Sequence, residues 1–128
     1  MAKYLLDTTA LINHLRGRPE VVDLVSSLAS QGHQLGICCI NVAELYSGLN
    51  PGEQDRAERL VDSLDYYEVS REAAKQAGRY RYDFARRGVT LSFADTLIAA
   101  TAIEEMATLI TANAKDFPMD ELQLVEHH

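Results

Sequence analysis

The stretch that decides the fold is residues 92–117, which read SFADTLIAATAIEEMATLITANAKDF. Ser92 is a residue type favoured at helix N-caps, so a helix is predicted to begin directly after it. Residues 97–103 of this helix are apolar on nearly every side, and such a helix has to be buried. Residues 108–111 then predict a short strand. The stretch therefore predicts a buried helix that leads directly into a core strand.

The rest of the chain repeats this alternation of short apolar runs and helical segments. Pro19, Asn41 and Ser70 are predicted helix starts, and Gly88 is the predicted end of the helix that Ser70 opens. Strands separated by helices favour right-handed crossovers, and therefore a parallel sheet with helices on both faces. The other predicted strands are Tyr4–Leu6, Leu35–Ile40, Tyr66–Val69 and, as a fifth, Leu122–Val125.

Size and composition predict one globular domain over residues 1–128. The chain has 47% hydrophobic and 24% charged residues, which is ordinary for a globular protein and argues against disorder. It has neither an apolar run of about 18 residues nor the pattern of a signal peptide. The adjacent Cys38 and Cys39 are interpreted as small buried residues in a reducing compartment, so we expect a cytoplasmic protein with no membrane contact.

The formal net charge of −7 argues against a protein that binds nucleic acid with its whole surface. It leaves open a local basic patch, or contact with phosphate through a divalent cation. The terminal residues 125–128 resemble the remnant of a purification tag, so their histidines are left out of the predicted chemistry.

Four acids lie near predicted strand ends or helix starts. Asp7 directly follows the first strand, Glu44 lies one helical turn after the second, and Asp116 lies just beyond the fourth. Asp95 lies in the first turn of the buried helix. Ligands of parallel sheets bind beyond the carboxyl ends of the strands. If the first and fourth strands are neighbours, we expect the four carboxylates to meet in one cleft.

Each acid also has a purely structural explanation. Glu44 and Asp95 lie three residues after the potential caps Asn41 and Ser92, and the other two acids fit a helix cap and a turn. Capping, however, does not require four caps to meet in one place. Clustered carboxylates repel one another, and a divalent cation relieves that repulsion. Oxygen ligands alone favour Mg²⁺ or Mn²⁺, whose natural chemistry here is phosphodiester hydrolysis.

Four segments of the chain stand out as motifs: LLDTTALI (5–12), NVAEL (41–45) with Gly48-Leu49, ADTLIAATA (94–102) and LITANAKDF (109–117). In this order they resemble the motifs of PIN-domain proteins, and the resemblance spans residues 4–117. No single motif is specific, but four in order in a chain of this length are a strong signal. The resemblance is nearest to the VapC toxins of bacterial and archaeal toxin–antitoxin pairs.

The resemblance implies a three-layer α/β/α fold with a central, mainly parallel sheet of four to five strands. It also implies a magnesium- or manganese-dependent endoribonuclease that is a homodimer and is inhibited by a VapB-type antitoxin. In such proteins a water activated by the metal would attack the phosphate. The acids that match the family's metal ligands are Asp7, Glu44, Asp95 and the more variable Asp116, and the matching supporting residues are Thr9 and Asn113.

Two positions depart from the family pattern. Asn41 stands where Ser or Thr is commoner, and it caps a helix equally well. Phe93 stands where some members have a further acid, which implies weaker binding of a second metal ion.

Basic residues give a less specific signal. Arg71, Lys75 and Arg79 recur at four-residue spacing on one face of a predicted helix. This face is either a track for RNA or for an acidic antitoxin segment, or a solvated surface paired with Glu72 and Asp83. The residues considered as possible RNA contacts are Arg16, Arg18, Arg79, Arg86 and Lys115.

Three other interpretations were weighed. A phosphotransfer receiver has a lysine near its acids, as Lys115 is near Asp116, but it needs an acid pair early in the chain. A haloacid-dehalogenase-type phosphatase needs a second acid where this chain has Thr9. A non-catalytic PIN-like binding module is the third, and the complete set of four acids argues against it.

Overall fold

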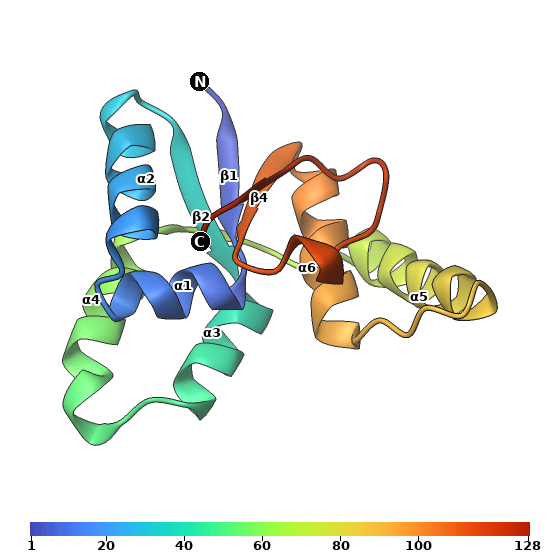
Figure 1. Ribbon diagram of the computed structural model, residues 1–128, viewed down its shortest axis with the longest axis horizontal. Coiled ribbons are helices and arrows are strands. Elements are labelled where there is room, and N and C mark those ends of the chain that lie inside the picture. Colours follow the sequence, from blue (N-terminus) through green and yellow to red (C-terminus); the bar gives the residue numbers. More distant parts are fainter.

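Five parallel strands form one sheet in the order β3-β2-β1-β4-β5 in the computed structural model, which describes residues 1–128 (Figure 1). The predicted parallel sheet is confirmed, as are its fifth strand and the pairing of the first strand with the fourth. In that pairing Leu6 lies beside Ile110, one residue before Asp7. The strands are β1 (Lys3–Leu6), β2 (Gln34–Cys38), β3 (Asp65–Tyr67), β4 (Ala107–Thr111) and β5 (Leu124–Glu126).

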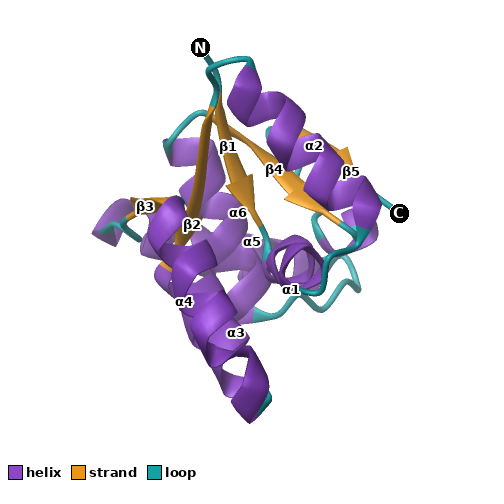
Figure 2. Cartoon of the chain, turned by 90° about the vertical axis from the view of Figure 1, so that its left-hand side faces the viewer, coloured by secondary structure: helices purple, strands orange, loops and turns teal.

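Helices cover both faces of the sheet and complete a three-layer α/β/α sandwich, as predicted. Figure 1 shows α5 and α6 on one side of the sheet, with α1, α2 and α4 on the other, and Figure 2 shows α1 and α2 over β1 and β4. The helices are α1 (Thr8–Leu15), α2 (Pro19–Ser30), α3 (Cys39–Ser47), α4 (Gln54–Ser63), α5 (Arg71–Arg86) and α6 (Phe93–Glu104). Two 3₁₀ turns are η1 (Pro51–Glu53) and η2 (Ala114–Asp116).

The central strands supply side chains to two separate cores. Leu5 and Leu109 belong to the core under α5 and α6, whereas Leu6 and Ile110 belong to the core under α1 and α2. All four side chains are fully buried. This division follows from the two-residue period of a strand, which sends successive side chains to opposite faces. The apolar runs that form β1 and β4 are therefore buried on both faces, as expected for a parallel sheet with helices on both sides.

The predicted caps of the two long helices are confirmed. The Ser70 hydroxyl accepts a hydrogen bond from the Ala73 N–H, and the Ser92 hydroxyl accepts one from the Asp95 N–H, both at 3.0 Å. Gly88 follows α5 with a φ of +80°, a conformation that favours glycine at a helix end.

The prediction that Asn41 opens a helix was wrong. Because β2 runs directly into α3, Cys38 occupies the cap position, and β2 ends two residues earlier than expected. Asn41 is the third residue of the helix and is completely buried. Its Oδ1 accepts a hydrogen bond from the Cys38 N–H at 2.8 Å, which satisfies a donor left unpaired at the helix start.

The cysteines are not bridged, as expected, but only Cys38 is buried. The prediction that Cys39 is also buried was wrong, because this residue begins α3 and its side chain is exposed. No helix of the structure combines the length and the apolar character needed to span a bilayer.

Candidate active site

The four predicted acids lie around the carboxyl ends of β1 and β4. The chain places β2 and β3 on one side of β1, and β4 and β5 on the other. A parallel sheet opens a crevice where the strand order reverses in this way, because the connections leave toward opposite faces. Asp7 follows β1 and Asp116 ends the turn after β4, while Glu44 and Asp95 lie near the starts of α3 and α6.

Asp7 is the most buried of the four, with 3% of its surface exposed. Its Oδ1 accepts hydrogen bonds from the Ala10 N–H and the Thr9 hydroxyl, both at 2.8 Å. Its Oδ2 accepts one from the Thr111 hydroxyl at 2.5 Å. Burial raises the pKa of Asp7 and outweighs these hydrogen bonds, which lower it. Asp7 therefore caps α1 and is held by three hydrogen bonds at the carboxyl end of β1.

The pKa of Asp95 is influenced by the other three acids. Burial raises its pKa most, and a hydrogen bond with Ser92 partly opposes this effect. The negative charges of Asp116, Glu44 and Asp7 each raise the pKa of Asp95 further. The structure therefore places the four acids near the same end of the sheet, within range for three of them to raise the pKa of Asp95, and we call the four the carboxylate cluster.

Glu44 is oriented by a residue that the sequence did not single out. The Thr8 hydroxyl donates to Glu44 Oε1 at 2.5 Å, and Asn41 Nδ2 lies 3.5 Å from the same hydroxyl oxygen. This chain of contacts connects α3 to the first turn of α1. The double threonine after Asp7 was visible in the sequence, but only Thr9 had been assigned a role.

The segment around Asp116 is fixed by backbone contacts. The Asn113 N–H donates to the Thr111 hydroxyl at 2.9 Å, and the Ala114 N–H donates to Glu126 Oε2 at 3.0 Å. Asn113 thus contributes its backbone to the network around Asp7. Glu126, in the strand β5, was not predicted to have a role near the cluster.

His127 also lies closer to the cluster than expected. It is 6% exposed, its N–H donates to the Thr111 carbonyl at 2.9 Å, and both of its ring nitrogens are buried without a hydrogen-bond partner. Its charge lowers the pKa of Asp7. The sequence offered no signal for this placement, because only the pairing of β5 with β4 brings residue 127 to the crevice.

The five possible RNA contacts are all exposed, and their neighbours differ. Lys115 adjoins Asp116 in η2, and Arg18 precedes α2. Arg16 forms an ion pair with Glu53 at 3.8 Å. The remaining two lie on α5, where Arg79 donates to Gln76 and Arg86 donates to Tyr82. On the same helix Lys75 pairs with Glu72 at 3.4 Å, whereas Asp83 has no ion pair.

The donor chemistry of the cluster fits a hard divalent cation. Its four members offer only carboxylate oxygens, which suit Mg²⁺ or Mn²⁺ better than zinc. No three acidic, histidine or cysteine side chains lie close enough to hold one ion by themselves. Mg²⁺ usually keeps several water ligands and takes one or two carboxylates, so the wider spacing is compatible with it.

The raised pKa values predict how the metal-free protein responds to pH. Between 3.8 and the raised pKa, the unfolded chain has lost the Asp95 proton while the folded protein retains it. This group therefore makes the free energy of unfolding fall as pH rises through that window. In EDTA at neutral pH, we expect Asp95→Asn to melt at a higher temperature than wild type. The difference in melting temperature should shrink as the buffer is acidified. Calorimetry that finds Asp95→Asn less stable than wild type at neutral pH would contradict this prediction.

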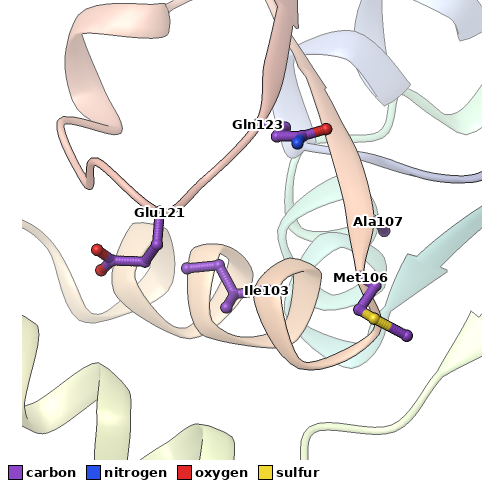
Figure 3. Close-up of a pocket in the computed structure, with 5 residues that line it drawn as sticks. All are labelled: Ile103, Met106, Ala107, Glu121 and Gln123. Carbon is purple, nitrogen blue, oxygen red and sulfur yellow. The ribbon is translucent and has the colours of Figure 1, made fainter.

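A pocket of about 290 Å³ lies away from the cluster, at the amino end of β4 (Figure 3). Its residues come from the end of α6, the start of β4 and the segment before β5. Its one ionisable group, Glu121, accepts a hydrogen bond from Tyr80. The pocket contains no member of the carboxylate cluster, and its lining offers no second ionisable group. The lining residues are Ile103, Met106, Ala107, Glu121 and Gln123.

Comparisons with known proteins agree with this geometry. A model of the PIN domain family matches residues 4–119. Ribonuclease VapC19 of Mycobacterium tuberculosis is 34% identical over 117 residues, which cover 90% of this chain and 92% of that protein. The crystal structure of VapBC2 from Rickettsia felis bound to promoter DNA contains a chain that superposes with a TM-score of 0.86. That chain is 25% identical, and the match covers 98% of this chain and 99% of that one. The chain therefore belongs to the PIN-domain family.

Proposed function

We propose that this protein is a divalent-metal-dependent endoribonuclease and the toxin of a VapBC-type toxin–antitoxin pair. The observation that carries the proposal is the carboxylate cluster, whose four acids follow β1, end the turn after the neighbouring β4 and lie near the starts of α3 and α6. None of the four acids forms an ion pair, so a cation is the natural way to balance their charge. The relatives named ribonuclease VapC support RNA as the substrate.

In this proposal Asp7, Glu44 and Asp95 hold the cation, in part through water, and Asp116 completes the site or binds a second ion. When bound, Mg²⁺ or Mn²⁺ supplies activation of a water molecule and stabilisation of charge on the phosphate. The chain's own threonines keep the acids in place: Thr9 and Thr111 orient Asp7, and Thr8 orients Glu44.

The proposed partners are a VapB-type antitoxin and a second copy of this chain. Support for the antitoxin comes from similar solved structures, among them VapBC2 from Rickettsia felis and a toxin–antitoxin complex from Klebsiella pneumoniae, whereas the second copy rests on the family resemblance. We propose that the pair acts in the cytoplasm, where the two unbridged cysteines would stay reduced. A small open reading frame for a DNA-binding protein directly upstream would support the pair. Co-expression should then suppress RNA cleavage and yield a complex containing a toxin dimer.

The decisive experiment is sequencing of RNA ends after incubation with the purified protein. With Mg²⁺ or Mn²⁺ we expect cuts at defined positions, and with EDTA we expect none. Cuts that persist in EDTA would contradict metal dependence, and the absence of cuts in every RNA class would contradict the proposed activity.

Of the other interpretations, membership of the PIN-domain family excludes the receiver and the dehalogenase-type phosphatase. The non-catalytic binding module is separated from the enzyme by calorimetric titration with Mn²⁺. An enzyme should bind the ion in wild type and much more weakly in Asp95→Asn, whereas a degenerate module should bind it in neither.

Replacing Thr111 by Val tests how firmly Asp7 has to be held. The change removes the donor to Asp7 Oδ2 and keeps the shape of the side chain. Loss of a hydrogen bond behind a metal ligand typically costs about 10- to 100-fold in metal affinity or activity, and we expect a loss of that size. The matched control is Thr108→Val on the same strand, which should cleave RNA like wild type. Equal activity of the two variants would contradict the assigned role of Thr111.

A further inference from the structure

Phe93 is a large aromatic residue in the first turn of α6, the helix that carries Asp95. It is the first residue of α6, two positions before Asp95, and 55% of its surface is exposed. Single exposed apolar residues are common and by themselves indicate nothing. The surroundings of this ring, however, are specific.

Arg81 of α5 covers one face of the Phe93 ring. Its guanidinium carbon lies 4.1 Å from the ring centroid, and its Nε donates to the Leu91 carbonyl at 3.0 Å. No carboxylate lies within ion-pair distance of Arg81. The guanidinium is therefore held in one orientation by α5 and the segment before α6, while its terminal N–H groups have no protein partner.

Two other arginines, Arg86 at the end of α5 and Arg87 directly after it, stack on aromatic rings, and both arrangements differ from this one. Arg86 lies over Tyr82 and also donates to its hydroxyl, while Arg87 lies over Phe84, which is buried. Only the Phe93 ring belongs to the same helical turn as a member of the carboxylate cluster. Together with Arg81, it places an aromatic face and a positive charge at the amino end of the helix that carries Asp95.

We propose that Phe93 and Arg81 form a nucleotide subsite next to the scissile bond, which rests on the proposed ribonuclease function. One unpaired RNA base stacks on the open face of the Phe93 ring, and a neighbouring phosphate contacts the terminal N–H groups of Arg81. Unpaired bases are commonly bound by stacking on aromatic side chains, and guanidinium groups bind phosphate oxygens well. Phe93 thus contributes to which nucleotide is accepted beside the cleaved bond, while the acids carry the chemistry.

The test uses a single-stranded RNA oligonucleotide that spans the cleavage position mapped for the wild-type protein. Its binding is measured by fluorescence anisotropy in the inactive Asp95→Asn background. Adding Phe93→Leu should weaken binding about 5- to 100-fold, the range for the loss of one stacked base. Phe93→Tyr should retain most of the affinity. The matched control is Tyr66→Leu, which removes an exposed ring from β3 and should leave binding unchanged.

Two further measurements separate this role from a structural one. In the active protein, Phe93→Leu should raise KM and leave kcat and the melting temperature nearly unchanged. Arg81→Gln should lower the slope of log affinity against log salt by about one unit, as expected for one lost phosphate contact.

The inference is overturned if Phe93→Leu binds the oligonucleotide as tightly as the parent protein. It is also overturned if Tyr66→Leu weakens binding equally, or if Phe93→Leu alters only the oligomeric state or antitoxin binding. Failure of the wild-type protein to cut any RNA with Mg²⁺ would instead contradict the proposed function. The two failures are therefore distinguishable.

Discussion

Asp95→Asn is expected to lower RNA cleavage by about 10²- to 10³-fold while the protein remains folded. A bound divalent cation contributes several kcal/mol of charge stabilisation, and each 1.36 kcal/mol changes the rate tenfold. The amide keeps the size of the carboxylate but loses its charge, so the cation is held less tightly. Burial and, to a smaller degree, the three neighbouring acids raise the pKa of Asp95, so removing its charge should stabilise the metal-free protein.

The matched control for this prediction is Asp62→Asn, which removes an exposed carboxylate on α4. Cleavage is measured with Mg²⁺ in excess, and Mn²⁺ binding is measured by calorimetry. The control should match wild type in both. If Asp95→Asn cleaved RNA at the wild-type rate, Asp95 would not belong to the active site. If Asp62→Asn lost as much activity as Asp95→Asn, the loss would be a general effect of net charge.

Leu109→Ala is expected to lower the free energy of unfolding by about 2–5 kcal/mol. Leu109 is fully buried in β4, and it pairs with Leu5 on one side and Leu124 on the other. Truncation loses buried apolar surface and leaves a cavity that neighbouring side chains only partly fill. The expected loss is a large part of the roughly 5–15 kcal/mol by which single domains are stable.

Urea unfolding of the metal-free protein measures this effect. The control is Val125→Ala on the adjacent strand β5, where 38% of the side chain is exposed. Val125→Ala should lower the free energy of unfolding much less than Leu109→Ala does. A midpoint for Leu109→Ala equal to that of the control would show that the core under α5 and α6 is not closely packed around this strand.

The arrangement of helices and strands follows from local sequence. The apolar runs and the helical periods between them predicted a parallel sheet covered on both faces, and Ser70, Ser92 and Gly88 marked helix ends correctly. Such signals are readable because hydrophobic periodicity and capping depend on residues within a few positions of one another. The same locality explains the error at Asn41. In a capping box the cap residue and the third residue of the helix bond to each other, and local sequence does not tell which of the two positions Asn41 occupies.

What the sequence by itself determined was therefore the set of elements, the buried helix from Phe93 onward and the presence of an acid near each critical strand end. The tertiary structure alone decided that these acids lie near the same end of the sheet, because this placement depends on the pairing of β1 with β4. It also decided the partners of the acids: Thr111 contacts Asp7 across 104 positions of chain, and Thr8 contacts Glu44 across 36. Contacts between such distant residues depend on the order in which strands pair, and that order results from packing of the whole chain rather than from any local pattern.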